Sequence, residues 1–297
     1  MENTNGFAHF DVVSDDADHQ FLDSNKGKCF TDSKTEVYRS IMKEWKILEQ
    51  NLPDSIYVRV YERRIDLMRA AIVGAAGTPY HDGLFFFDIV FPPDYPKHPP
   101  KLHYHSFGYR HNPNLYSSGK LCLSLLNTWP GRKSEKWDPS GSTILQVLLS
   151  IQALVLNDKP YYNEPGIPIS EGRSRAYNQQ MFLVTCYTAF HLLRRPPFNF
   201  EALVRAHFRE CAFRILSACS EYLNGRVSVG YYSSYSHPSS SSSKLHVSRS
   251  FKKNMIACYP TLLHAFRMNG ASLEGIAEHL ELESEHSEHK SGGIFKK

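Results

Sequence analysis

The chain has 297 residues, of which 41% are hydrophobic and 22% charged, and its formal net charge at pH 7 is +4. This balance is typical of a protein with a sizeable core, and the mild charge argues against nucleic-acid binding. The six cysteines include no Cys-X-X-Cys pair, which favours reduced thiols over a disulfide framework. We find neither a secretory signal nor an apolar stretch of membrane-spanning length, so we expect a soluble protein of the cytoplasm or nucleus without membrane contacts.

The first half of the chain predicts a helix followed by strands. Residues 1–30 are polar and contain five aspartates, which predicts a disordered acidic arm. A capping box at Ser33-Lys34-Thr35-Glu36 precedes apolar residues at helical spacing and predicts an amphipathic helix over residues 34–51. Alternating and apolar runs with short links then predict an antiparallel meander of four strands, near residues 56–61, 68–74, 84–91 and 102–105.

The second half is mainly helical in its pattern. After a polar loop, the apolar run from residue 142 to 155 predicts a core helix that covers the sheet. Two further helices are predicted over residues 174–195 and 199–223. A Ser/Tyr-rich linker is expected at residues 226–248, and a short helix with a charged tail at residues 249–297.

Three motifs occur in order between the first helix and the core helix: GAAGTPYHDGLF at residues 74–85, FPPDYPKHPPK at residues 91–101, and NPN at residues 112–114 followed by Gly119 and Cys122. They resemble the turn, the proline-rich segment and the active-site stretch of ubiquitin-conjugating (E2) enzymes. This resemblance covers about residues 33–170. The stretches NPNLY, GKLCLSLLNTW and PYYNEPG are also similar to the large hybrid E2/E3 class, the BRUCE/apollon kind and related plant enzymes.

The resemblance implies an α+β UBC fold with an N-terminal helix, a four-stranded antiparallel meander, an active-site loop, a core helix and C-terminal helices. It implies an E2 core domain at residues 31–225, including a C-terminal helical extension. Such an enzyme accepts ubiquitin from an activating enzyme (E1) as a thioester on Cys122 and transfers it to a substrate lysine. A separate E3 ligase is optional in the hybrid class. The resemblance implies no cofactor.

The resemblance assigns four candidate catalytic residues. Cys122 is the implied nucleophile, although a cysteine within LCLSLL is ordinarily a buried core residue, and thiolate attack requires access. Asn114 either donates to the oxyanion formed during lysine attack or braces the loop. Asn163 and Glu164 occupy the family's polar or acidic gate, where a carboxylate can orient the attacking lysine, or they serve only as turn residues.

Other positions depart from the family pattern. Asn112 replaces the usual histidine, and the neighbouring His111 leaves open a His111–Cys122 pair like that of a thiol hydrolase. Lys97 replaces the apolar residue that anchors RING-type ligases in many E2s. The histidines between residues 98 and 111 lack a cysteine pair, so we expect no metal site.

Partners follow from the same resemblance. The basic residues of the 34–51 helix are implied to dock E1, or they form a solvated face. Two alternative functions remain open: a catalytically idle E2-like binding module, and a conjugating enzyme for another ubiquitin-like modifier.

Overall fold

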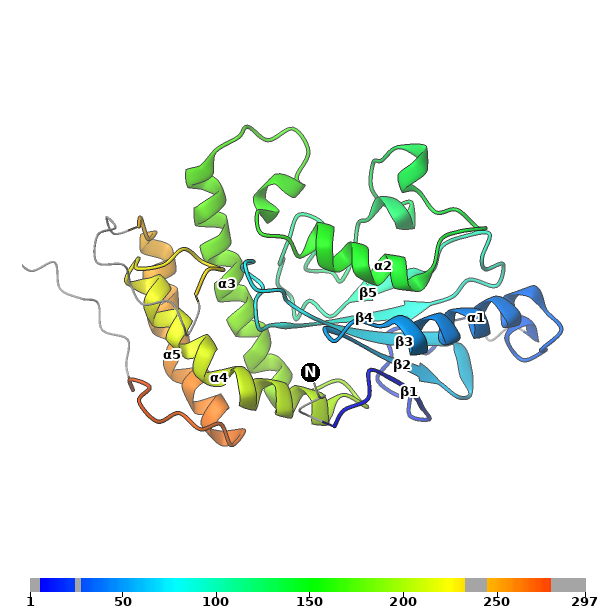
Figure 1. Ribbon diagram of the computed structural model, residues 1–297, viewed down its shortest axis with the longest axis horizontal. Helices are drawn as coiled ribbons and strands as arrows, with labels where there is room; N and C mark the ends of the chain where they lie inside the picture. Colours follow the sequence, from blue (N-terminus) through cyan, green and yellow to red (C-terminus); the bar gives the residue numbers. More distant parts are fainter. Residues whose placement is uncertain (1–5, 25–27, 233–244, 279–297) are drawn as a thin grey trace, which may run out of the picture.

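The computed structural model describes residues 6–24, 28–232 and 245–278. One sheet separates two helical layers (Figure 1). Its five strands follow chain order across the sheet: β1 (Phe10–Val13), β2 (Ile56–Tyr61), β3 (Arg64–Val73), β4 (Leu84–Val90) and β5 (Lys101–Tyr104). β2 to β5 are antiparallel neighbours, whereas β1 pairs with β2 in parallel. The predicted four-strand meander is confirmed, and the fifth strand was not predicted.

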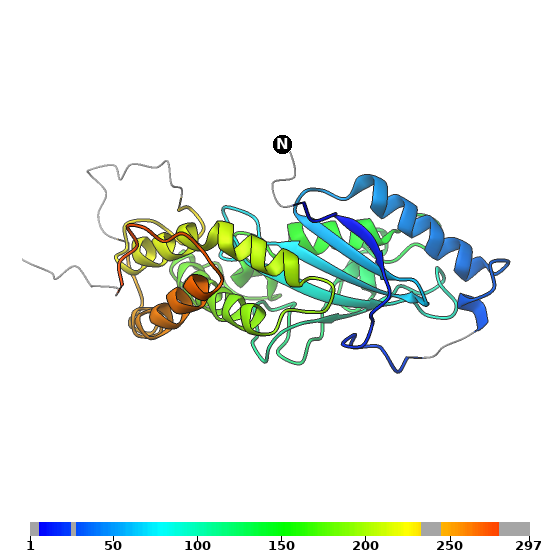
Figure 2. The same cartoon turned by 90° about the horizontal axis from the view of Figure 1, so that it is seen from below.

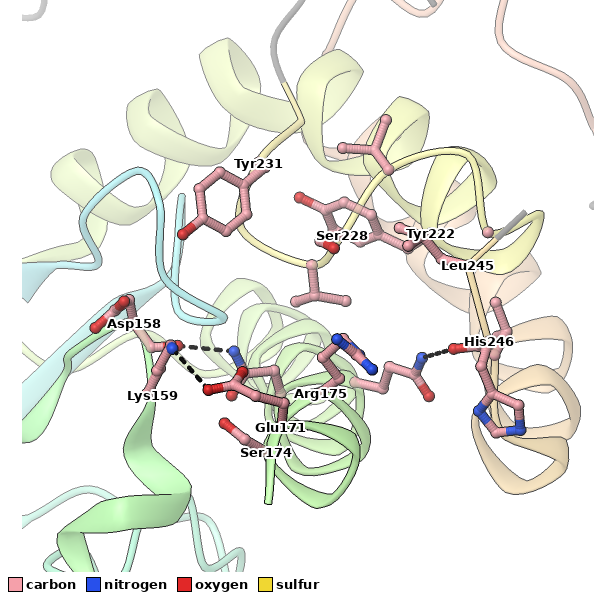
Figure 3. Close-up of a pocket in the computed structure, with 16 residues that line it drawn as sticks. Asp158, Lys159, Glu171, Ser174, Arg175, Tyr222, Ser228, Tyr231, Leu245 and His246 are labelled. Carbon is pink, nitrogen blue, oxygen red and sulfur yellow. Dashed lines mark hydrogen bonds and ion pairs between the residues drawn. The ribbon is translucent and has the colours of Figure 1, made fainter. Parts of the chain in front are cut away.

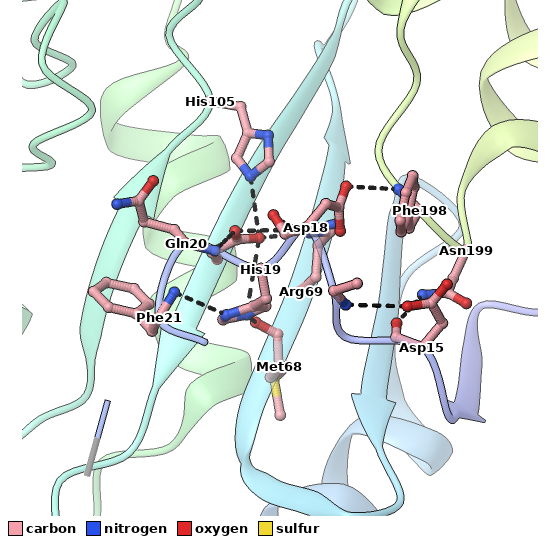
Figure 4. A network of polar contacts seen from close by, with 12 residues as sticks. Asp15, Asp18, His19, Gln20, Phe21, Met68, Arg69, His105, Phe198 and Asn199 are labelled. Carbon is pink, nitrogen blue, oxygen red and sulfur yellow. Dashed lines mark hydrogen bonds and ion pairs between the residues drawn. The ribbon is translucent and has the colours of Figure 1, made fainter. Parts of the chain in front are cut away.

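The N-terminal segment corrects one expectation, because residues 6–24 are ordered against the sheet rather than forming a disordered arm. After β1, this segment crosses a face of the sheet and meets Arg69 of β3, whose side chain is fully buried (Figure 4). Arg69 Nη1 lies 2.6 Å from Asp18 Oδ1, and its Nε lies 2.5 Å from Asp88 Oδ1. A buried guanidinium requires countercharges, and the acidic segment supplies one of them. From its polar composition alone, we expected this carboxylate to be solvated.

Two helices cover one face of the sheet. α1 (Glu36–Asn51) is capped by Thr35, whose Oγ1 accepts from Tyr38 N at 3.2 Å, so the helix begins two residues later than predicted. α2 (Ile144–Ser150) confirms the core helix, but the chain turns into a π-helical segment over Ile151–Val155. Glu44 of α1 is buried and accepts hydrogen bonds from Tyr95 Oη and Ile144 N. Burial raises the pKa of Glu44, and its two donors join α1, α2 and the loop after β4.

Three longer helices form the second layer, as Figures 1 and 2 show: α3 (Glu171–Arg194), α4 (Glu201–Leu223) and α5 (Arg249–Met268). They pack on the sheet through Ala71, Leu84 and Phe86. α3 and α4 confirm the two predicted helices, and α5 is the helix expected after residue 249, at 20 residues. None of the helices within the described ranges is long and apolar enough to cross a lipid bilayer.

The predicted linker and tail are described only in part. Residues 233–244 and 279–297 lie outside the described residues. Both described ends of the linker are held by hydrogen bonds, since Gly77 N donates to Gly230 O at 3.0 Å and Gln179 Nε2 donates to His246 O at 3.0 Å.

Candidate active site

Cys122 lies in an extended segment that runs beside the loop before it. An isolated bridge pairs Leu115 with Leu121, and Cys122 N donates to Asn114 O at 2.9 Å. Leu121 and Leu123 belong to the main hydrophobic cluster, whereas Cys122 belongs to none of the clusters among the described residues. Because side chains alternate along an extended segment, the thiol faces away from the two leucines.

The other five cysteines have structural positions. Cys186, Cys211, Cys219 and Cys258 belong to the cluster of the second helical layer, and Cys29 packs against the main cluster. Burial raises the pKa of Cys211 to about 12, which keeps that thiol protonated. Placement therefore singles out Cys122 as the candidate nucleophile.

Access to Cys122 is restricted in this conformation, since the residue is only 2% exposed. A groove of about 600 Å³ runs beside its segment and is lined by Leu121, Leu126 and Thr128, but not by Cys122 itself. Thioester exchange requires the incoming thioester to reach the sulfur. A role as nucleophile would therefore require Cys122 to become more exposed than it is in this conformation.

Asn114 braces the Cys122 segment. Its Nδ2 donates to Cys122 O at 3.0 Å, and its backbone N donates to Asn112 Oδ1 at 2.9 Å. Asn114 is buried, and its Oδ1 has no hydrogen-bond partner among the described residues. Of the two roles left open by the sequence, the structure displays the bracing role, because the amide donor is already engaged with a backbone carbonyl.

Asn112 is the polar hub beneath this loop. It is fully buried, and its Nδ2 donates to Val155 O at 2.6 Å and to Tyr80 Oη at 2.9 Å. Its Oδ1 accepts from Asn114 N and, at 3.3 Å, from Asn163 Nδ2. Asn112, which replaces the family's usual histidine, thus connects the first motif, the cysteine loop and the segment after α2.

His111 is not a partner for Cys122, so the thiol-hydrolase alternative is wrong. Its Nδ1 lies 3.0 Å from Tyr104 Oη, and its Nε2 lies 2.7 Å from Thr188 Oγ1. Both ring nitrogens are therefore occupied by hydroxyl groups. Burial lowers the pKa of His111 to about 3, so the imidazole is neutral at pH 7.

Asn163 and Glu164 come to the same loop from the 3-10 helix η5 (Pro160–Asn163) and the residue after it. Glu164 is exposed, and its Oε2 lies 3.5 Å from Nη2 of Arg110. That same Nη2 donates to Pro113 O at 3.3 Å. The structure thus gathers all four sequence-predicted site residues around one loop. It adds Arg110, for which no motif gave a signal.

Comparison with known proteins decides the family. Residues 40–182 match the family model described as ubiquitin-conjugating enzyme. The putative ubiquitin-conjugating enzyme E2 38 of Arabidopsis thaliana is 49% identical over 225 residues, which cover 74% of this chain and 68% of that relative. The chain belongs to the ubiquitin-conjugating enzyme family. Its sheet and helices are the UBC fold, and the predicted α+β class is confirmed.

Longer E2 relatives match as well. The probable ubiquitin-conjugating enzyme E2 24 of Arabidopsis thaliana is 50% identical over 266 residues, or 88% of this chain and 29% of the relative. The human dual E2 ubiquitin-conjugating enzyme/E3 ubiquitin-protein ligase BIRC6 is 37% identical over 239 residues, or 73% of this chain and 5% of the relative. The relationship to the hybrid class is confirmed, although this E2 chain spans less than a third of either relative.

Gly119 lies where the loop before Cys122 meets β5 in this E2. Its φ is +84°, and a Cβ there would lie 2.1 Å from the His103 ring. Only glycine adopts this conformation freely and leaves room for the imidazole. Its carbonyl accepts from Tyr104 N at 2.7 Å, so the motif glycine fastens the loop to β5.

No group of three or more histidines, cysteines or carboxylates within the described part of the E2 is arranged to hold a metal ion.

A cavity of about 260 Å³ lies behind η5, between α3 and the loops around residues 225–231 and 245–247 (Figure 3). The Lys159–Glu171 ion pair, at 3.1 Å, lies at its border with the E2 core. Asn178 Nδ2 donates to Asp158 O at 2.7 Å. These contacts hold η5, and with it Glu164, against the start of α3.

Proposed function

We propose that this chain is a ubiquitin-conjugating module that accepts ubiquitin from E1 as a thioester on Cys122 and transfers it to a substrate lysine, with hybrid E2/E3 behaviour. The observation that carries the proposal is the placement of Cys122. It is the one cysteine of the six that belongs to none of the hydrophobic clusters, and it is held through its backbone N–H and C=O by Asn114. Because the chain belongs to the ubiquitin-conjugating enzyme family, we interpret the cysteine placed in this way as the acceptor of ubiquitin.

In the first step, the Cys122 thiolate attacks the carbonyl of the E1–ubiquitin thioester, and the E1 thiolate leaves. In the second step, the lysine amine attacks the new thioester carbonyl, a tetrahedral oxyanion forms, and its collapse expels the Cys122 thiolate and leaves an isopeptide bond. The thioester is already activated, so the module contributes mainly by positioning. No triad is required.

Two side chains have proposed roles in the second step. Asn114 Nδ2 would release its hydrogen bond to Cys122 O and donate to the oxyanion instead. A donor of this type contributes about 3 kcal/mol. Glu164 would orient the lysine ammonium and receive its proton, after releasing Arg110. An exposed ion pair like Arg110–Glu164 contributes at most about 1 kcal/mol, so this release is inexpensive. Asn163 would act through Asn112 by holding the loop in place.

The surface of the module fits the proposed partners. Exposed basic side chains suit docking of E1: Arg39, Lys43 and Lys46 on α1, and Lys34 just before its N-cap. Lys97 is exposed next to Pro96, whose carbonyl accepts from Trp137 Nε1 at 2.7 Å. A charged residue at this apolar anchor position argues for activity without a RING-type ligase. The cytoplasmic or nuclear location stays a prediction.

A non-reducing gel tests the proposal directly. The chain is incubated with E1, ubiquitin and ATP. We expect a thiol-sensitive adduct that disappears in Cys122→Ala and becomes a base-labile ester in Cys122→Ser. Cys29→Ser is the matched control, since Cys29 is half-buried whereas the other five cysteines are buried, and it should charge normally.

The low exposure of Cys122 favours one second candidate, a catalytically idle E2-like binding module. That candidate predicts no adduct under any of these conditions. Substituting other ubiquitin-like proteins and their activating enzymes tests the remaining alternative, a different modifier.

A further inference from the structure

A second cavity, of about 310 Å³, lies in the C-terminal helical layer. It is formed at the C-terminal ends of α3 and α5, with Arg205 from the second turn of α4. Every residue that lines it follows residue 182, so the cavity lies wholly outside the segment that matches the family model. Its chemistry is therefore a property of the helical extension rather than of the conjugating core.

The cavity is positively charged. Arg194, Arg205 and His264 line it, and no carboxylate does. Arg194 and Arg205 form no ion pair with any other described residue, and the Arg194 guanidinium rests 5.4 Å from the Phe190 ring centroid. By contrast, Arg267 of α5 is paired with Glu278 at 2.6 Å. Two unpaired guanidinium groups beside one cavity favour an anionic ligand, because each offers a planar set of donors to a carboxylate.

The rest of the lining is apolar and accessible. Phe190 and Leu193 are half-buried, and Met268 is 75% exposed. A flexible thioether adapts to differently shaped apolar side chains. The cavity volume accommodates one or two such side chains.

One hydrogen-bonding group in the wall is unused. Asn269, 8% exposed, has an Oδ1 with no hydrogen-bond partner among the described residues. Its Nδ2 is fixed by donation to Arg205 O at 2.8 Å, so the side chain holds its orientation. An unfilled buried acceptor is costly, so a ligand N–H that reaches Oδ1 would be favoured. A peptide supplies such donors at every residue.

We propose that this cavity binds an acidic peptide segment of a partner protein, with a large apolar side chain against Phe190 and Met268 and carboxylates at Arg194 and Arg205. The identification of that partner as a protein to be ubiquitinated rests on the proposed function. α3 connects the cavity rigidly to the candidate active site, since it begins after η5 and its 24 residues span about 36 Å. A docked partner is thereby held within reach of Cys122, which raises the local concentration of its lysines.

Binding is tested with the full chain and a fluorescein-labelled peptide, Ser-Glu-Phe-Glu-Asp-Leu-Glu-Ser, by fluorescence anisotropy. The double variant Arg194→Glu, Arg205→Glu should weaken binding by at least about ten-fold, because both carboxylate partners become repulsive. Arg249→Glu is the matched control, since it reverses an exposed arginine at the opposite end of α5, and it should change the affinity by less than about two-fold. A peptide with alanine in place of Phe and Leu should bind at least about ten-fold more weakly.

Three results would overturn the proposal: undetectable binding, equal loss in the double variant and in Arg249→Glu, and a full-affinity complex with the alanine peptide. The chain's own acidic tail is a competing occupant, tested with the full-length variant Glu281→Gln, Glu283→Gln, Glu285→Gln. A rise in peptide affinity of about ten-fold in that variant would contradict docking of a partner. Thioester formation on Cys122 is measured in parallel. Peptide binding without thioester formation on Cys122 would contradict only the proposed function. Thioester formation without peptide binding would contradict only the docking site.

Discussion

Asn114 and Cys122 are joined by a pair of backbone-directed hydrogen bonds. Cys122 N donates to Asn114 O at 2.9 Å, and Asn114 Nδ2 donates to Cys122 O at 3.0 Å. This pair fixes the cysteine segment to the preceding loop. The candidate oxyanion donor is therefore already adjacent to the candidate nucleophile, although it is directed at the backbone carbonyl of Cys122.

Asn114→Ala separates the two roles of this side chain. We expect a loss of about 1 kcal/mol in the free energy of unfolding from the missing brace. If Nδ2 also serves the oxyanion, discharge to free lysine should slow by about a hundred-fold, and charging by E1 far less. Single-turnover gels measure both rates. Equal slowing of the two steps would show that Asn114 only braces the loop.

Asn112→Ala should destabilise the protein by about 3 kcal/mol, because it removes a buried hub, leaves Asn114 N without its partner and leaves Val155 O with only the 3.3 Å hydrogen bond from Asn163 Nδ2. Urea denaturation followed by fluorescence measures the change. Asn51→Ala is the control, since its exposed side chain bonds only within α1, to Ile47 O. A loss below about 1 kcal/mol in Asn112→Ala would contradict the hub.

His111 predicts a specific pH dependence of stability. Burial lowers its pKa from 6.5 to about 3, so between these values the unfolded chain binds a proton that the folded chain excludes. Stability due to this group is therefore complete above about pH 6.5 and falls as the pH is lowered. Between about pH 7 and pH 5, the wild type should lose about 2 kcal/mol more than His111→Gln. Identical pH profiles of the two proteins would mean that His111 titrates normally in the fold.

Asp18→Ala tests the ordered N-terminal segment. Arg69 is fully buried, so removal of one of its two carboxylates should cost about 2–3 kcal/mol and expose the amides of β1 to hydrogen exchange. Asp23→Ala, an exposed aspartate of the same segment, should leave both unchanged. Rapid exchange of β1 in the wild type would restore the disordered-arm interpretation.

Local sequence patterns predicted most of the fold. The apolar spacing of α1, the alternation in β2 and the long runs of α3 and α4 each reflect burial of one face, and such signals are contained within a few residues. β1 and the segment after it were missed because Asp18 is ordered by Arg69, 51 residues further along. Composition indicates how polar a segment is, but it does not reveal a distant buried charge.

In the candidate site too, motifs in the sequence predicted some features, whereas others depend on contacts between distant segments. Motifs located Cys122, Asn114, Asn163 and Glu164, which the fold brings to one loop. Arg110 carried no signal, because its role arises from contacts with Pro113 and Glu164 that exist only in the folded chain. The apolar LCLSLL context indicated that Cys122 could be buried, and its 2% exposure agrees with that alternative, whereas the motif alone implied an accessible thiol.

Intact-protein mass spectrometry after incubation with E1, ubiquitin and ATP tests the central claim most directly. The account predicts one thiol-sensitive ubiquitin per chain, mapped to residue 122, and a hydroxylamine-sensitive ester at the same residue in Cys122→Ser. A chain that remains unmodified, or an adduct that persists in Cys122→Ala, would contradict it.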